Sequence, residues 1–133
     1  MKGRAWTNEQ WEYYKGRVLA TLAQHIGEEK AIPADELYER VFSAPADDKI
    51  NATKPLRKVV RALRKEGTPI GSSVSNQGGG YYLARTASEL DQVADRFLNV
   101  GLKAFIVVSR MRKIALPELL GQMRLNLEKN PNA

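Results

Sequence analysis

The 133-residue sequence contains no cysteine and only one histidine, His25. The lack of cysteine excludes disulfide frameworks, thiolate zinc sites and cysteine nucleophiles, and it is typical of proteins from a reducing compartment. No apolar run approaches the roughly 18 residues that span a bilayer, and residues 1–10 lack the apolar core of a secretion signal. We therefore expect a cytoplasmic protein without a membrane segment.

Acidic residues are nearly absent from the middle of the chain. Residues 49–85 carry eight Lys or Arg against one Glu, whereas the remaining residues are close to balanced, so this segment supplies the net charge of +6. A localised cationic patch is typical of a protein that binds a polyanion. Since 43% of the residues are hydrophobic, the chain is also expected to bury a core of its own.

Local signals predict a mainly α fold with one small β-hairpin. Thr7 and Gln10 have capping-box spacing, and Gly27 is the stop signal for the helix that they begin. Thr53 is the expected cap of a later helix, which ends before Gly67. The predicted elements of this part are a helix after Thr7, a helix over 34–42, a loop over 43–52, a helix over 54–66 and a hairpin over 69–84.

The predicted helix over residues 54–66 separates apolar from cationic residues. At about 100° per residue, Leu56, Val59, Val60 and Leu63 share one arc that faces a core. The opposite arc is cationic throughout and contains Lys54, Arg57, Lys58, Arg61, Arg64 and Lys65. Like charges one turn apart destabilise a helix slightly. A polyanion would offset that cost, while the alternative is an ordinary solvated face.

The stretch "LRKVVRALRKEGTPIGSS…GGGYYLA" resembles the recognition helix and wing of winged helix-turn-helix DNA-binding domains, especially the biotin-operon-repressor-like type and related bacterial and phage modules. The resemblance covers residues 7–85. It implies that helix 54–66 lies in the DNA major groove and that hairpin 69–84 is a wing. The loop before Thr53 is longer than a compact helix-turn-helix connection, and residues 71–80 lack Lys and Arg.

The resemblance also implies which residues contact DNA. Lys54, Arg57, Lys58 and Arg61 match exposed positions of a recognition helix. Arg57 and Arg61 are the expected base readers, because a guanidinium donates two parallel hydrogen bonds to guanine. The wing-tip residues Ser75, Asn76 and Gln77 complete the predicted site, with turn chemistry as the alternative role of Asn76 and Gln77.

The chain after residue 85 is expected to form a helical C-terminal extension over 86–133. Apolar residues recur there at alternating steps of three and four, which is typical of a helical packing seam. Gly101 leaves two shorter helices as an alternative, and the apolar run around Val107 leaves a strand as another. The seam is predicted to pair two copies or to fold back on the first domain, with a different partner protein as a third alternative. Its residues are Leu90, Val93, Phe97, Val100, Ala104, Val107, Met111 and Ile114.

We therefore predict a non-enzymatic protein that binds double-stranded DNA selectively, without cofactor or metal, as a homodimeric transcriptional regulator. The alternative is a winged-helix module, of phage origin, that docks a protein or assists replication. His25 has no partner residues with metal-ligand spacing, and "GSSVSNQGGG" lacks the ending of a phosphate-binding loop. Paired tyrosines at 13–14 and 81–82 are expected to pack rather than to act as nucleophiles.

Overall fold

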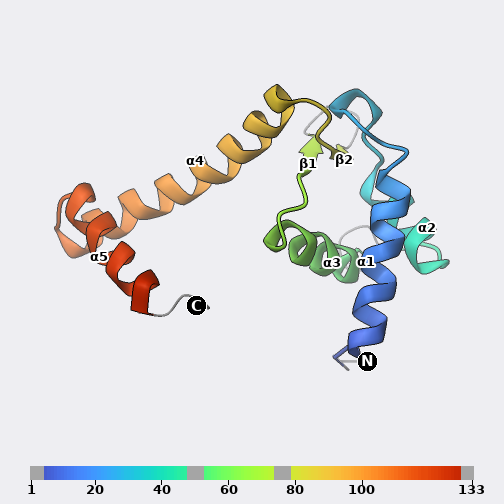
Figure 1. The fold of residues 1–133 in the computed structure, drawn as a ribbon, viewed down its shortest axis with the longest axis horizontal. Helices are drawn as coiled ribbons and strands as arrows, with labels where there is room; N and C mark the ends of the chain where they lie inside the picture. Colours follow the sequence, from blue (N-terminus) through green and yellow to red (C-terminus); the bar gives the residue numbers. More distant parts are fainter. Residues whose placement is uncertain (1–4, 48–52, 74–78, 130–133) are drawn as a thin grey trace. The chain divides into compact units, whose positions relative to one another are not determined.

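The computed structural model of the protein describes residues 5–47, 53–73 and 79–129. Two compact units follow one another along the chain, the first ending at Val93 and the second beginning at Ala94. The fold is mainly α with one antiparallel hairpin, as predicted (Figure 1). In chain order the elements are α1 (Asn8–Leu22), the short 3-10 helix η1 (Glu28–Lys30), α2 (Ala34–Phe42), α3 (Lys54–Lys65), β1 (Ile70–Ser73), β2 (Gly80–Leu83), α4 (Ala87–Arg112) and α5 (Leu116–Lys129).

Helix α1 begins with the predicted capping box. The backbone N–H of Gln10 donates to the Thr7 hydroxyl over 3.1 Å, and the backbone N–H of Thr7 donates to the Gln10 side chain over 2.9 Å. The helix ends at Leu22, well before Gly27. Ile26 leaves the helix because its backbone forms a bridge with Leu83 of the hairpin. Tertiary strand pairing therefore ends the helix before the predicted stop at Gly27.

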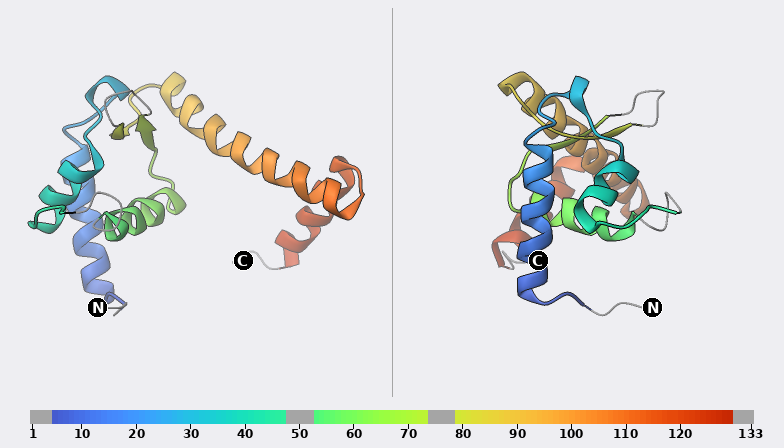
Figure 2. Two further views of the ribbon diagram at one scale, coloured as in Figure 1. Left: turned by 180° about the vertical axis from the view of Figure 1, so that it is seen from behind. Right: turned by 90° about the vertical axis from the view of Figure 1, so that its right-hand side faces the viewer.

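The core of the first unit lies between α1, α2, α3 and the hairpin (Figure 2). All four apolar residues predicted for the inner face of α3 are buried, with at most 2% of their surface exposed. This result confirms which side of α3 faces inward. The buried cluster consists of Val18, Leu22, Ile32, Leu37, Val41, Leu56, Val59, Val60, Leu63 and Ile70.

The hairpin is held in register by close packing and by a third extended segment. Ile70 pairs with Leu83, and Gly71 pairs with Tyr82, whose ring lies directly over that glycine. Ile32 adds a short antiparallel bridge to Tyr81, with backbone hydrogen bonds of 2.9 Å in both directions. The hairpin is thus attached to the segment that leads into α2.

Helix α4 runs without a break through Gly101, so the alternatives of two shorter helices and of a strand near Val107 are both wrong. The helix ends at Arg112, because Lys113 adopts a left-handed conformation with φ of 56°. Ile114 therefore lies beyond the helix, which corrects its predicted place at the end of the helical seam. Over the described parts of the chain, no helix combines the length and the hydropathy needed to cross a bilayer.

Candidate nucleic-acid interface

Helix α3 presents its cations on the side opposite the buried core. Lys54, Lys58, Arg61 and Lys65 are exposed, whereas Arg57 and Arg64 are half-buried. The chain forms this helix here because its apolar residues recur at helical spacing, and Pro55 occupies the first turn, where its missing N–H has no partner to lose. The structure therefore brings the six predicted cations together on one helix, four of them fully accessible.

The four exposed cations of α3 form no ion pair with any other described residue. The acidic group nearest in sequence, Glu66, is engaged elsewhere, since its carboxylate lies 2.6 Å from the Lys15 ammonium of α1. Lys15 also contacts Glu12 at 3.0 Å, and the hydrogen bonds that its ammonium donates to the two carboxylates raise the pKa of Lys15, with that to Glu66 contributing most. The one carboxylate that follows the cationic run is thus paired outside it.

Arg57 is oriented by the residue that precedes α3. Its guanidinium Nη1 donates to the hydroxyl of Thr53 over 2.7 Å, and Thr53 is itself buried. Thr53 does not cap the helix through its side chain, which differs from the sequence expectation. Its hydroxyl accepts the Arg57 hydrogen bond instead, so the buried threonine limits the rotamers of this arginine.

Arg64 connects α3 to the hairpin. Its Nε donates to the backbone carbonyl of Ile70 over 2.9 Å, and its Nη2 donates to the Ser72 hydroxyl over 2.9 Å. The guanidinium also lies 5.8 Å from the centre of the Tyr81 ring. Burial lowers the pKa of Arg64 from its usual value, although a guanidinium stays charged throughout the physiological range.

This role of Arg64 was not predicted from the sequence, which placed it with the exposed cations. The available signal was the short connection of four residues between Lys65 and Ile70, which must bring β1 back beside the last turn of α3. Ser75, Asn76 and Gln77 lie outside the described residues, as does the segment 48–52 of the preceding loop.

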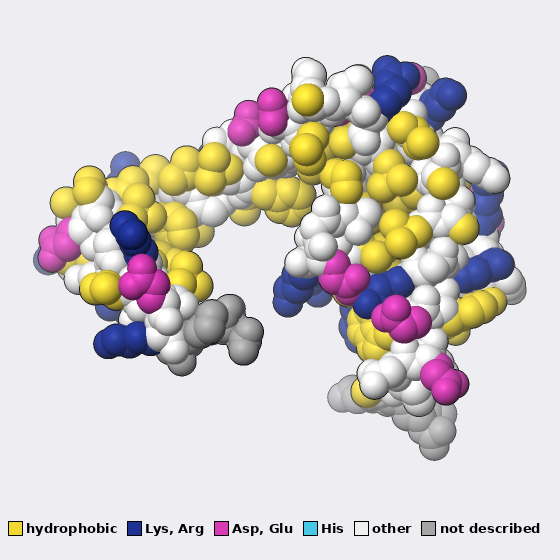
Figure 3. All heavy atoms as spheres, viewed as in Figure 1, with side chains coloured by type: hydrophobic (Ala, Val, Ile, Leu, Met, Phe, Trp, Pro, Cys, Tyr) yellow, Lys and Arg dark blue, Asp and Glu magenta, His cyan; other side chains and the backbone are white. Residues whose placement is uncertain are grey.

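The predicted seam of α4 is mostly exposed. Phe97, Val100, Val107 and Met111 have 53%, 69%, 54% and 75% of their surface exposed. Figure 3 shows hydrophobic side chains gathered along this helix. Two members differ from the rest, because Val93 is only 7% exposed and Ile114 lies beyond the helix.

His25 and the acidic side chains are the remaining candidates for a catalytic or metal site. The Nδ1 of His25 lies 2.8 Å from the carbonyl of Lys30, which accounts for one ring nitrogen. Across residues 5–47, 53–73 and 79–129 no group of three or more His, Asp or Glu side chains is placed to hold a metal ion.

Comparisons with protein-family models, with curated proteins and with solved structures found no match to this chain.

Proposed function

We propose that the first unit binds double-stranded DNA, with α3 in the major groove and the β1–β2 hairpin as a wing beside it. The observation that carries the proposal is the set of four exposed cations on α3 that have no ion-pair partner among the described residues. DNA phosphates would supply the missing negative charge. The order of helices and hairpin is that of a winged helix-turn-helix domain, which agrees with the resemblance in sequence.

The cations of α3 divide into two roles on this proposal. Lys54, Lys58 and Lys65 neutralise phosphates, because an ammonium on a flexible stem binds as a point charge. Arg61, exposed in the middle of the face, reads guanine through its O6 and N7 atoms. Arg57 reads a neighbouring base, and its hydrogen bond to Thr53 reduces the side-chain entropy that binding would otherwise cost.

The proposed biological role is transcriptional regulation in the cytoplasm, without catalysis or a cofactor. A replication or protein-docking module is the alternative, which would favour exposed aromatic side chains on the outer face of α3. The described outer face carries only cations and no aromatic residue. This observation favours a nucleic acid over a protein as the partner of α3.

The test is fluorescence anisotropy on random duplex DNA over a series of salt concentrations. If Lys54, Lys58 and Lys65 each neutralise a phosphate, the slope of log K against log salt should be about −3, and affinity should fall about 40-fold between 50 and 200 mM salt. A protein-docking module would show no such binding. A flat salt dependence would therefore contradict the proposal.

The residues are tested with two matched double variants. Arg57→Ala with Arg61→Ala should weaken binding at least about 10-fold, because two base contacts are lost. Arg110→Ala with Arg112→Ala removes the same charge from α4 and should leave binding nearly unchanged. Equal losses in both variants would mean that α3 is not the reader. Thermal unfolding of each variant checks that the fold is kept.

A further inference from the structure

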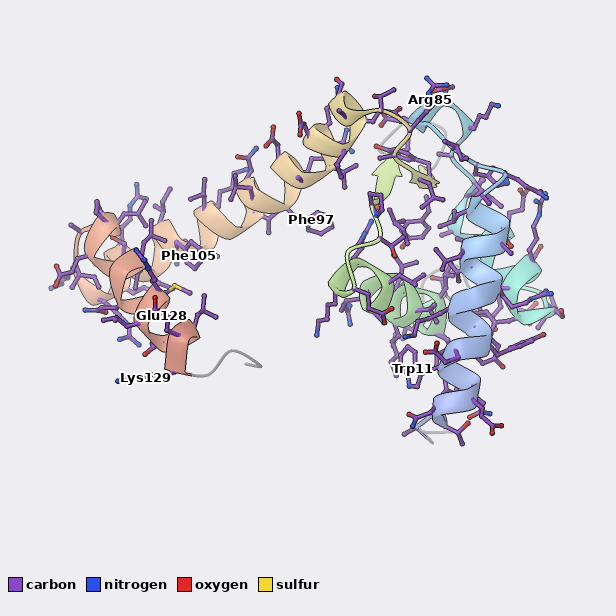
Figure 4. All side chains as sticks on the ribbon, in the orientation of Figure 1. Trp11, Arg85, Phe97, Phe105, Glu128 and Lys129 are labelled. Carbon is purple, nitrogen blue, oxygen red and sulfur yellow. The ribbon has the colours of Figure 1, made fainter. Side chains whose placement is uncertain are left out.

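Two faces of α4 differ in what covers them inside the second unit. Phe105 lines an apolar groove of about 410 Å³ together with Leu120 and Met123 of α5, so this side of α4 faces α5. The seam residues Phe97, Val100 and Val107 lie roughly 80°, 140° and 160° away from Phe105 around the helix and remain exposed. Figure 4 shows the Phe97 side chain projecting from the α4 ribbon. Within its own unit, α4 thus has an apolar face that α5 leaves open.

The exposed seam is palindromic in its spacing. Its steps of three and four residues are symmetric about Leu102, so reversing the helix about that point exchanges Phe97 with Val107 and Val100 with Ala104. All four positions lie inside the continuous helix. An apolar face with this symmetry can pair with the same face of a second copy that runs in the opposite direction.

Side-chain volumes favour the antiparallel over the parallel direction. In a parallel pair, Phe97 would face Phe97 and Ala104 would face Ala104. The side-chain volume would then be too large in the Phe97 layer and too small in the Ala104 layer. The antiparallel pair sets Phe97 against Val107 and Val100 against Ala104, so each layer combines a larger with a smaller residue. Interiors pack at uniform density, and layers of even volume satisfy that requirement.

Charge along α4 does not decide the direction. Its first half carries Glu89, Asp91 and Asp95 against Arg96, and its second half carries only cations. Asp91 and Asp95 lie on the side of the helix opposite the seam, so they do not face the partner's cations in either direction. One flank would bring Arg96 near Arg110 and Lys103 near its own copy, but these cations are exposed, so solvent and salt screen their repulsion.

The size of the seam sets the expected strength of pairing. The exposed area of Phe97, Val100, Ala104, Val107 and Met111 is roughly 500 Å² per copy, or about 1,000 Å² for a pair, near the lower limit of specific interfaces. The second unit, from Ala94 onward, is also about as small as an independently folding core permits. A second copy would supply the apolar surface that this unit lacks.

We propose that α4 binds α4 of a second copy of this chain in the antiparallel direction, centred on Leu102. The two copies of Ala87, where α4 begins, are then about 45 Å apart along the pair. If the proposed function is correct, the dimer carries two DNA-binding first units, so one DNA duplex is contacted at two places instead of one. The pairing itself rests on the seam alone and does not depend on DNA binding.

Light scattering over a concentration series tests the pairing in the absence of DNA. The wild type should change from monomer to dimer as its concentration rises. Phe97→Glu should weaken the dimer about 100-fold or more, because it buries a charge in a seam layer. Leu98→Glu is the matched control, since Leu98 is also exposed at 59% but lies off the seam, and it should have little effect. A wild type that stays monomeric at every concentration would overturn the proposal.

The direction is tested with spin labels on full-length protein, which has no native cysteine to interfere. Asn99→Cys and Gln92→Cys place labels on the exposed side of α4 away from the seam, three and ten residues before its centre. Antiparallel pairing predicts axial separations of about 9 Å and 30 Å, whereas parallel pairing makes the two distances equal. Equal distances would refute the antiparallel arrangement. A dimer of the predicted geometry that fails to bind DNA would refute only the proposed function, and a DNA-binding monomer only the pairing.

Discussion

Arg64 and Arg61 are one turn apart on the same cationic helix, yet the structure predicts opposite consequences for their replacement. Arg64 donates two hydrogen bonds of 2.9 Å to the hairpin and lies over Tyr81. Hydrogen bonds from a charged donor contribute about 1.5–3 kcal/mol each when well shielded, and a cation–π contact about 0.5–1 kcal/mol. Since Arg64 is only half-buried, we discount the sum and expect Arg64→Ala to cost about 2–3 kcal/mol.

The assay is urea or thermal unfolding of Arg64→Ala, Arg64→Lys and Arg61→Ala. For a unit of this size, 2–3 kcal/mol corresponds to a fall in Tm of roughly 10–20 °C. Arg64→Lys should recover only part of the loss, because an ammonium cannot reproduce the fork that reaches both Ile70 and Ser72. Arg61→Ala should change stability by no more than about 0.5 kcal/mol while it weakens DNA binding. If Arg64→Ala unfolds at the wild-type temperature, the hairpin does not depend on this contact and the reasoning is refuted.

Two further predictions concern the first unit. Gly71→Ala should destabilise it by about 1–3 kcal/mol, because an added Cβ would lie 2.3 Å from the Tyr82 ring. Gly16→Ala should instead stabilise it by about 0.5–1 kcal/mol, because the space around Gly16 in α1 is open. Chemical denaturation that ranks the two variants the other way would contradict the packing described. Hydrogen bonds from the backbone N–H of Arg85, and then from that of Glu28, lower the pKa of Glu89 from its ordinary value of 4.5. The ionised Glu89 therefore contributes its full stabilisation above pH 4.5, and this contribution is lost as the pH falls through the lower pKa of the folded state. Unfolding measured from pH 6 to pH 3 should therefore show a weaker acid dependence in Glu89→Gln than in wild type.

Elements with strong local signals were predicted closely. The structure confirms the helix over 34–42, the capping box at Thr7, and a hairpin within residues 69–84. The errors have tertiary causes. Helix α1 ends early because the backbone near Ile26 pairs with the hairpin, and no local pattern indicates a partner that lies more than fifty residues away. Gly101 lowers helix propensity by about 1 kcal/mol, and α4 nevertheless continues through it, so this local signal was too weak to end the helix.

The composition of the candidate site was predictable, but the separate roles of its cations were not. Helical periodicity assigns Arg61 and Arg64 to one outer face, because it depends only on the angle of each residue around the helix axis. Which part of that face stays open depends on where the chain returns after Gly67, and here β1 returns beside Arg64. The same limit applies to α4, where periodicity identifies the seam but cannot show that α5 packs on a different face. In both helices the cationic or apolar arc is set by sequence, and the usable part of that arc is set by the next element along the chain.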